Sequence, residues 1–217
     1  MTKMSDNLED LKNNHQDFSK GSLDSNQEKN PYVLFGRWFD EAIASGELEA
    51  NACVISTVSV DLQPSARIVY LKEMVDNSFV FYTNYSSQKG KELAINPKAS
   101  MLFFWPKNER QVRIEGEVVK LPEAISDAYF ESRPLQSKLG AWASHQSDEL
   151  VDSSEIHNRM AFYSDKFGDV VPRPEHWGGY AVIPQCIEFW QGRPSRLHDR
   201  IVFTSFEGTW KIHRKNP

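Results

Sequence analysis

Three arginines, a histidine and an aspartate lie within the eight residues 193–200, near the C-terminal end of the sequence. Two aromatic residues and a glycine precede them in 189–192. Arginine presents forked N–H donors that suit phosphate or carboxylate, and a nearby histidine can donate, accept or titrate near neutral pH. The pattern indicates a strand that ends in a functional loop. A hairpin in which the three arginines pair with local acids fits the same residues, and the composition leaves both interpretations open.

Two cations interrupt a second, otherwise apolar stretch, Arg67-Ile68-Val69-Tyr70-Leu71-Lys72. A charge inside such a strand is costly unless it is paired or bound to a ligand. Arg67 and Lys72 are an odd number of positions apart, so a regular strand points them to opposite faces. Either residue alone is therefore also compatible with a solvated charge at a sheet edge.

A third group combines hydroxyl side chains with a lysine, because Tyr82 and Thr83 precede a serine-containing turn and Lys89. Hydroxyl groups, a lysine and a helix N-terminus are the components of an anion site. An ordinary capped helix over residues 88–95 explains the same pattern, and the residues alone favour that simpler interpretation.

Tyr129, Arg133 and Ser137 recur at positions i, i+4 and i+8. On a continuous helix they would line one face and offer a phenol, a guanidinium and a hydroxyl group. Pro134 interrupts that helix, so the shared face is approximate. The alternative is a polar face on a helix at an interface.

Strands dominate the elements that must position these residues. The predicted strands cover residues 52–60, 65–73, 78–84, 99–105, 110–120, 179–182, 186–191, 200–205 and 209–214. One predicted helix runs from the cap Asn30 and Pro31 to about Gly46, and others cover 88–95, begin at Pro122, resume after Pro134 and begin at the cap Ser153-Ser154. Strands joined by short turns favour an antiparallel sheet that closes into a barrel, with helices covering it.

Composition bounds the class of protein. The chain has 217 residues, of which 40% are hydrophobic, and this suits one domain with a real core. The net charge of -5 gives no reason to expect binding to nucleic acid or to an anionic membrane. Two cysteines without a CxxC motif predict neither a disulfide framework nor a metal site. No apolar run approaches the roughly 20 residues of a membrane helix, so we expect a cytoplasmic protein.

The first 29 residues differ in composition from the remainder. They are polar, with Phe18 as their only aromatic residue, and cannot bury much surface. We therefore expect a mobile N-terminal arm over 1–29 and one domain over 30–217.

The run Glu188-Phe189-Trp190-Gln191-Gly192, followed by Arg196-Leu197-His198-Asp199-Arg200, resembles the C-terminal signature of pyridoxamine 5'-phosphate oxidases. The resemblance extends over roughly residues 31–217. It implies an α+β, mainly β fold, the split β-barrel of the FMN-binding type with flanking helices, in a homodimer with sites at the interface. It also implies that FMN-dependent oxidation of pyridoxamine 5'-phosphate and pyridoxine 5'-phosphate yields pyridoxal 5'-phosphate, while O2 is reduced to hydrogen peroxide.

The same resemblance assigns residues to two sets. The residues implied to bind FMN are Arg67, Ile68, Val69, Tyr70, Leu71, Lys72, Tyr82, Thr83, Gln88, Lys89, Gln111, Gln146, Ser147, Trp190 and Arg200. Those implied to bind substrate are Lys72, Tyr129, Arg133, Ser137, Arg196, Leu197 and His198. Within the second set, Arg196 and His198 are the catalytic pair, which fixes the substrate ring and its C4' substituent.

The sequence departs from the family pattern at three places. Gln88 stands where the family has an arginine, and Lys91, one helical turn along, offers a replacement cation. The arm has His15 and Phe18 where the family tends to have an arginine and a tyrosine. The chain ends Arg-Lys-Asn-Pro over residues 214–217 where the family commonly ends Arg-Leu-Ala-Pro.

Two other functions remain as alternatives. A non-catalytic protein that binds flavin or pyridoxal phosphate would lose the substrate set and keep the FMN set, whereas both sets are present here. A flavin reductase that uses a nicotinamide cofactor has no supporting GxGxxG motif, although split barrels do not need one.

Overall fold

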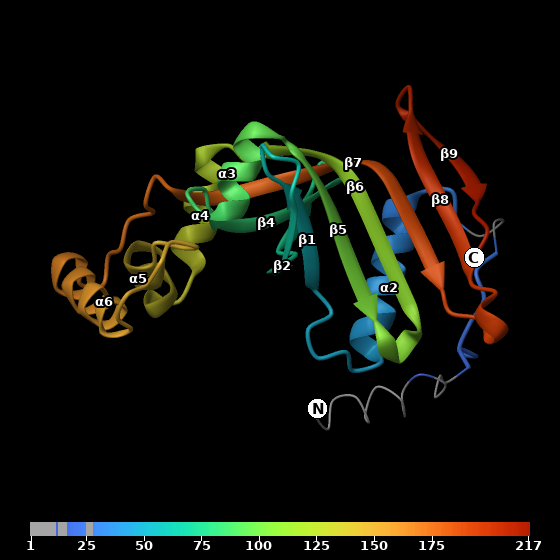
Figure 1. Cartoon of the computed structure of the whole chain (residues 1–217), viewed down its shortest axis with the longest axis horizontal. Coiled ribbons are helices and arrows are strands. Elements are labelled where there is room, and N and C mark those ends of the chain that lie inside the picture. The colour runs from blue at the N-terminus through green and yellow to red at the C-terminus, as the bar shows by residue number, and fades with distance from the viewer. Residues whose placement is uncertain (1–11, 13–16, 25–27) are drawn as a thin grey trace. The chain divides into compact units, whose positions relative to one another are not determined.

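The computed structural model describes residue 12, residues 17–24 and residues 28–217 (Figure 1). The chain forms two compact units. The terminal unit contains the described residues up to Ala50, together with Phe104–Val112 and Glu188–Pro217, and the central unit contains Asn51–Phe103 and Arg113–Ile187. Three strands, β5 (Lys98–Trp105), β6 (Arg110–Lys120) and β7 (Trp177–Gln191), run through both units.

Nine strands of the described residues belong to one sheet, whose order is β2-β1-β5-β6-β7-β4-β3, with β8 paired to β7 and to β9. The remaining strands are β1 (Ala52–Val58), β2 (Pro64–Tyr70), β3 (Glu73–Val75), β4 (Ser78–Asn84), β8 (Asp199–Phe206) and β9 (Thr209–Arg214). Figure 1 shows β8 and β9 side by side as the C-terminal hairpin, and their pairing is antiparallel. The pairs β1–β2, β1–β5, β3–β4 and β4–β7 are antiparallel as well. The prediction of a mainly β, antiparallel fold is confirmed.

The helices begin where the sequence predicts them. They are α2 (Pro31–Ala44), α3 (Gln88–Ile95), α4 (Glu123–Ser132), α5 (Leu135–Ala143) and α6 (Ser154–Phe167), with short 3-10 turns at Pro106–Asn108 and Pro194–Arg196. Asn30 caps α2, because its side chain accepts from the Tyr32 N–H at 2.9 Å. Ser87 caps α3 in the same way. The predicted cap at Ser153 is wrong: its side chain makes no capping bond, and Asp152 Oδ1 accepts from the Ser154 N–H instead.

Two strand predictions need correction. The predicted strand 65–73 is divided, because the chain changes partner between Leu71, whose N–H donates to Asn51 O, and Lys72, whose N–H donates to Val80 O. The predicted strands 179–182 and 186–191 are one strand, β7, which continues through Pro184. Proline lacks the N–H donor that marks a regular ladder, but its fixed φ is compatible with extended backbone.

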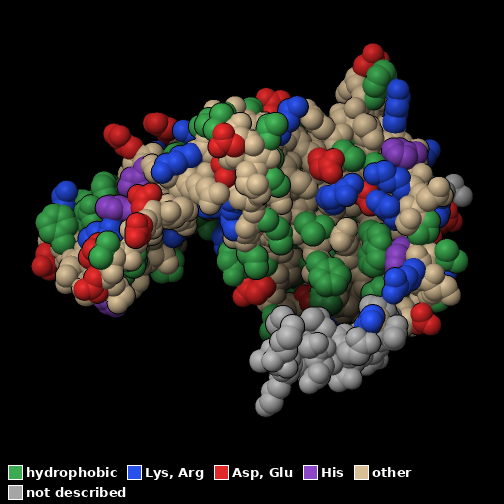
Figure 2. Space-filling view, viewed as in Figure 1, with side chains coloured by type: hydrophobic (Ala, Val, Ile, Leu, Met, Phe, Trp, Pro, Cys, Tyr) green, Lys and Arg blue, Asp and Glu red, His purple; other side chains and the backbone are tan. Residues whose placement is uncertain are grey.

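Each unit has its own aromatic core. In the terminal unit, Trp38 of α2 packs edge-on against Phe189 at 5.2 Å between ring centroids, and Phe189 packs against Phe203 at 5.6 Å. In the central unit, Phe130, Leu139, Val171 and Trp177 form a buried cluster against which α5 and α6 pack. Burial of each such side chain contributes about 1.5–3 kcal/mol. Over α5 and α6, Figure 2 shows acidic, basic and apolar side chains interspersed.

The described residues contain no helix long and apolar enough to cross a membrane. They also contain no group of three or more His, Cys, Asp or Glu side chains placed to hold a metal ion.

Candidate functional site

A cavity of about 570 Å³ opens in the central unit, and we call it the Arg133 pocket. The predicted site residues that line it are Tyr70, Lys72, Tyr82, Thr83, Tyr129, Arg133, Ser137 and Gln146. They come from β2, the β2–β3 connection, β4, α4, the α4–α5 connection, α5 and the segment that follows α5. The change of partner strand after Leu71 is what places Lys72 at this cavity.

Tyr129, Arg133 and Ser137 do not lie on one continuous helix. Helix α4 ends at Ser132, and Arg133 adopts an extended conformation with φ -75° and ψ 149°. Proline disfavours the α conformation in the residue before it, so Pro134 produces this break. The three side chains nevertheless line the same pocket.

Arg133 lacks the hydrogen bonds that a buried guanidinium normally has. Its Nη1 atom is buried and has no hydrogen-bond partner among the described residues. The guanidinium carbon lies 4.4 Å from the ring centroid of Trp177 and 5.5 Å from that of Phe130. Burial lowers the pKa of Arg133. An unpaired buried donor is costly, and an anion in the pocket would satisfy it.

Trp177 also lines the Arg133 pocket, and the sequence analysis did not single it out. Its ring is nearly parallel to that of Tyr82, with 11° between the planes and 5.5 Å between the centroids. The predicted strand begins at residue 179, whereas β7 begins at Trp177; the tryptophan before two glycines is the only local signal of this residue.

A second cavity of about 380 Å³, the Arg67 pocket, also lies in the central unit. The predicted residues that line it are Arg67, Ile68, Gln88, Lys89, Gln146 and Ser147. Lys89 is buried, and its Nζ donates to Thr83 Oγ1 at 3.0 Å and to Gln146 Oε1 at 2.9 Å. Burial, together with the charge of Arg67, lowers the pKa of Lys89 to about 8. Gln146 lines both pockets and so links them.

The buried carboxylate of Glu92 in α3 forms an ion pair with Arg67. Arg67 Nη2 lies 3.5 Å from Glu92 Oε2 and donates to Ser65 Oγ at 2.6 Å. The Gln88 amide donates to Glu92 Oε1 at 2.9 Å. Lys91 does not replace the missing arginine at this pocket, because its Nζ lies 3.7 Å from Asp148 on the exposed side.

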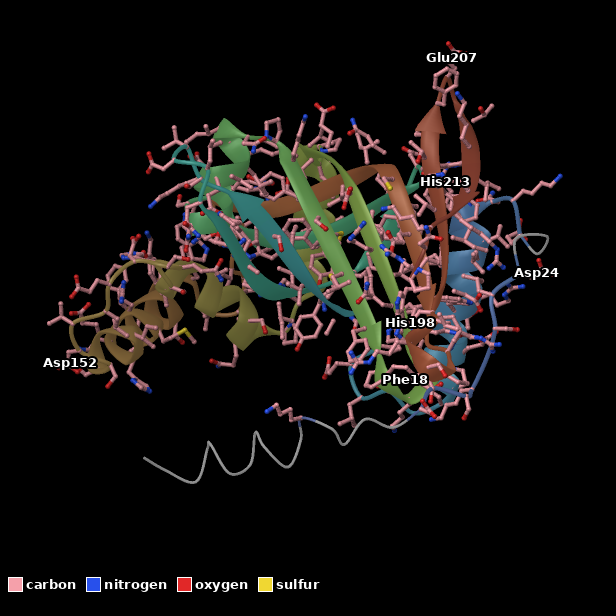
Figure 3. The ribbon with its side chains drawn as sticks, turned by 45° about the vertical axis from the view of Figure 1, so that its right-hand side comes forward. Phe18, Asp24, Asp152, His198, Glu207 and His213 are labelled. Carbon is pink, nitrogen blue, oxygen red and sulfur yellow. The ribbon has the colours of Figure 1, made fainter. Side chains whose placement is uncertain are left out.

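The His198 ring of the terminal unit packs against two aromatic rings. Its ring centroid is 4.5 Å from that of Trp190 and 5.7 Å from that of Phe18 (Figure 3). The Arg193 N–H donates to His198 Nδ1 at 3.2 Å, so a neutral ring carries its proton on Nε2. Burial, together with the positive charge of Arg196, lowers the pKa of His198.

The three arginines of this loop behave differently. Arg200 contacts the buried Glu188 through Nε at 2.8 Å and Nη2 at 2.7 Å, and Arg193 Nε lies 3.4 Å from Asp199. Among the described residues, Arg196 makes no ion pair, and it is exposed. Both open interpretations of this stretch therefore hold in part: two arginines pair with local acids, and one stays available. Arg196 has a φ of 61°, in the left-handed region, which is typical of functional sites.

The altered C-terminus contributes to the same cluster. Lys215 Nζ lies 3.3 Å from Glu188 Oε2, and Asn216 O accepts from Arg200 Nη1 at 3.0 Å. These two residues, which replace the usual Leu-Ala, therefore surround the Arg200–Glu188 pair.

Part of the predicted arm contacts the same loop of the terminal unit. The Phe18 ring meets Trp190 edge-on at 5.7 Å between centroids. Arg193 Nη1 donates to Gly21 O at 2.6 Å. A Cβ atom at Gly192 would lie 2.6 Å from the Phe18 ring, so a larger residue there would displace Phe18. His15 and the rest of the arm before residue 17, apart from residue 12, lie outside the described residues.

Four further predicted residues do not line either cavity. Val69 and Leu71 are buried in the sheet, each 8% exposed. Gln111 is half-buried at the start of β6, and Leu197 is exposed in the loop of the terminal unit.

Comparisons with known proteins identify the family. The family model described as pyridoxamine 5'-phosphate oxidase matches residues 39–162, and the pyridoxine 5'-phosphate oxidase C-terminal dimerisation region matches residues 177–217. A pyridoxine/pyridoxamine 5'-phosphate oxidase of Ralstonia nicotianae is 53% identical over 203 residues, which cover 93% of this chain and 96% of the relative. One of Pseudomonas paraeruginosa is 49% identical, over 91% of this chain and 93% of the relative.

Similarity to solved structures identifies the fold. PhzG from Burkholderia lata, in complex with tetrahydrophenazine-1-carboxylic acid, has a TM-score of 0.84 at 30% identity and covers 91% of this chain and 100% of its own. An FMN-binding protein from Nostoc punctiforme has a TM-score of 0.71 at 14% identity, over 88% of this chain and 100% of its own, and supports the fold alone. The fold is the split β-barrel of the FMN-binding type. The chain belongs to the pyridoxamine 5'-phosphate oxidase family and is an oxidoreductase.

Proposed function

We propose that this protein oxidises pyridoxamine 5'-phosphate and pyridoxine 5'-phosphate to pyridoxal 5'-phosphate, with O2 as the electron acceptor and hydrogen peroxide as its reduced product. With the amine substrate, water supplies the aldehyde oxygen and the nitrogen leaves as ammonia. The observation that carries the proposal is the pair of cation-lined cavities in the central unit, joined at Gln146. Two anion sites match a reaction in which both the cofactor and the substrate are phosphate esters. The names of the relatives agree with this substrate class.

FMN is the cofactor that the fold and the family imply, and the Arg67 pocket fits its phosphate. Arg67 and Lys89 bring two cations to one cavity, and hydroxyl groups and the Gln146 amide surround them. When bound, FMN accepts a hydride equivalent from the substrate and passes the electrons to O2. We place the other FMN contacts on predicted residues of the strands, Gln111 and Trp190, whereas the guanidinium of Arg200 is occupied by Glu188 and Asn216.

The Arg133 pocket would hold the phosphate of the substrate. Its unpaired guanidinium donor, the ammonium group of Lys72 and the hydroxyl groups of Tyr129 and Ser137 are the groups that a phosphate ester requires. We assign Arg196 and His198 of the terminal unit to the substrate ring and its C4' substituent. The Arg193 N–H orients the His198 ring and leaves Nε2–H as a donor toward the substrate.

We further propose a homodimer with its sites at the subunit interface. The match of residues 177–217 to a dimerisation region supports it. The purified protein should therefore have twice the chain mass of 25.0 kDa in solution, as measured by light scattering.

The test of function uses the purified protein and its phosphorylated substrates. We expect a yellow protein with a flavin absorbance spectrum, and hydrogen peroxide release on addition of pyridoxamine 5'-phosphate. Unphosphorylated pyridoxamine is the control, and it should react poorly because it leaves the Arg133 pocket unsatisfied. A yellow protein that releases no peroxide would instead be the non-catalytic binding protein, and one that consumes a nicotinamide cofactor would be a reductase.

A further inference from the structure

Three aromatic rings form a nearly parallel stack along one wall of the Arg133 pocket. Tyr82 and Tyr129 are 3.9 Å apart between centroids with 15° between their planes, and Tyr129 and Trp177 differ by only 5°. The rings come from β4, α4 and β7, so three different elements fix the stack. Such stacks are rigid, and each ring presents a π face to its neighbours.

Two contacts fix Tyr82 in this stack. Its hydroxyl donates to Glu73 Oε1 at 2.5 Å. On the neighbouring strand its partner is Gly179, where a Cβ atom would lie 2.9 Å from Tyr82 Cε1. Gly179 therefore leaves room for the Tyr82 ring. Trp177 lies two residues before Gly179 on β7 and is opposite Asn84 in the same β4–β7 pairing.

The Arg133 side chain is held by ring faces rather than by polar partners. Among the described residues its guanidinium makes no hydrogen bond and no ion pair, and Nη1 is buried. Its nearest ring is that of Trp177, 4.4 Å from the guanidinium carbon, and Trp177 is 7% exposed. A cation over the face of tryptophan is attracted to it, and more strongly when water is excluded.

We propose that Trp177 is a positioning residue, which holds the Arg133 guanidinium over the pocket and leaves its N–H donors free for the phosphate of the substrate. A carboxylate in the place of Trp177 would orient the arginine equally well, but it would occupy the donors and repel the phosphate. A ring face orients the cation without competing for those donors. The inference rests on the proposed function, because it takes the ligand of Arg133 to be the substrate phosphate.

The experiment compares Trp177→Leu with Trp177→Phe in the FMN-loaded enzyme. Trp177→Leu removes the π face and should raise the KM for pyridoxamine 5'-phosphate roughly three- to thirtyfold, with kcat near that of the wild type. Trp177→Phe keeps a π face and should restore most of the affinity. The Kd of pyridoxal 5'-phosphate, measured by titration, should rise in parallel with KM, and this measurement does not depend on turnover.

Trp142→Leu is the matched control, because Trp142 packs on the same buried cluster and lies, among the described residues, against the rings of Tyr163 and Phe167 rather than against Arg133. It should lower Tm comparably and leave KM unchanged.

In an Arg133→Leu background, Trp177→Leu should have little further effect on KM or Kd. Equal changes in KM for the two tryptophan variants, or an undiminished effect without Arg133, would overturn the inference while the oxidase function stood. A wild-type enzyme that binds pyridoxal 5'-phosphate but releases no peroxide would instead contradict the proposed function.

Discussion

Arg200 of the terminal unit and Arg133 of the central unit are both half-buried arginines with opposite surroundings. Arg200 has Nε and Nη2 on the buried carboxylate of Glu188 and donates from Nη1 to Asn216 O. Among the described residues, Arg133 pairs with no carboxylate, and its guanidinium lies over the face of Trp177. An arginine whose donors are filled by the protein serves the fold, whereas one whose donors are open is available to a ligand.

Arg67 lies between these extremes. Glu92 is 3.5 Å away, but the short contacts of Arg67 are to the neutral hydroxyl groups of Thr57 and Ser65. A hydroxyl contact is weaker than a charge-assisted one, so a phosphate can replace it at little cost. In the order Arg200, Arg67, Arg133, the guanidinium donors are less and less occupied by charged groups of the protein. A substitution of each arginine tests its place in this order.

The largest effect is expected from Arg200→Leu. This change removes the guanidinium from Glu188, which is 2% exposed, and leaves Lys215 Nζ at 3.3 Å. Breaking a buried ion pair from one side costs about 3 kcal/mol or more, which lowers Tm by roughly 6–12 °C in a chain of this size. Thermal unfolding with saturating FMN measures this loss.

The control for that experiment is the double variant Arg200→Leu with Glu188→Leu. It removes both charges and should recover much of the lost stability, since no buried carboxylate remains that has lost its guanidinium partner. If the single variant has the same Tm as the wild type, the Arg200–Glu188 pair does not stabilise the fold, and the contrast between Arg200 and Arg133 fails.

Arg133→Leu tests the other end of the order. It should raise KM and spare kcat, because the bond to the substrate phosphate is present in both the ground and transition states. A bond to a charged group contributes about 1.5–3 kcal/mol, so kcat/KM should fall roughly ten- to a hundredfold while flavin content stays near wild type. Steady-state kinetics and flavin absorbance measure the two quantities.

Arg67→Leu is the counterpart in the second cavity. It should lower flavin content first, and excess FMN should recover the activity. An exchange of these outcomes, with flavin lost from the Arg133 variant and kept by the Arg67 variant, would show that the two pockets are assigned the wrong way round.

Lys89 gives the Arg67 pocket a dependence on pH. The pKa of Lys89 lies at about 8 without ligand, and a bound phosphate raises it. FMN therefore binds with full affinity below about pH 8. The affinity falls as the pH rises from there to the higher pKa that Lys89 has in the FMN complex. From pH 7 to pH 9 the FMN Kd should rise by up to roughly tenfold, because one proton is linked to binding. Fluorescence titration measures it, and Lys89→Met should show a flat profile over the same range.

Local patterns predicted most of the helices and strands, whereas the family resemblance supplied the candidate site residues, many of which line the two cavities. Asn30 with Pro31, and Ser87 before α3, predicted helix starts because caps and proline act over a few residues. The register of Tyr82 opposite Gly179, and of Trp177 near Arg133, depends on pairing between segments far apart in the sequence, so no local pattern shows it. For the same reason the sequence indicated that Gln88 replaces a cation, but not that Arg67 of β2 lies beside Glu92 of α3.

The smallest effect is expected from Gln88→Arg, which restores the arginine that the family has at this position. If the Arg67 pocket were short of one cation only, the added charge would tighten FMN binding roughly tenfold or more. Glu92 lies four residues further along α3 and already accepts from the Gln88 amide, so the new guanidinium would pair with this carboxylate.

We therefore expect Gln88→Arg to tighten FMN binding only about two- to fivefold. The combined variant Gln88→Arg with Glu92→Gln removes the competing carboxylate, and its gain over Glu92→Gln alone should approach tenfold. FMN dissociation constants for these three variants and the wild type, measured at one pH and one salt concentration, decide between the two outcomes. A tenfold gain from Gln88→Arg alone would mean that Glu92 engages only Arg67 and the hydroxyl groups, and leaves position 88 free to reach the phosphate.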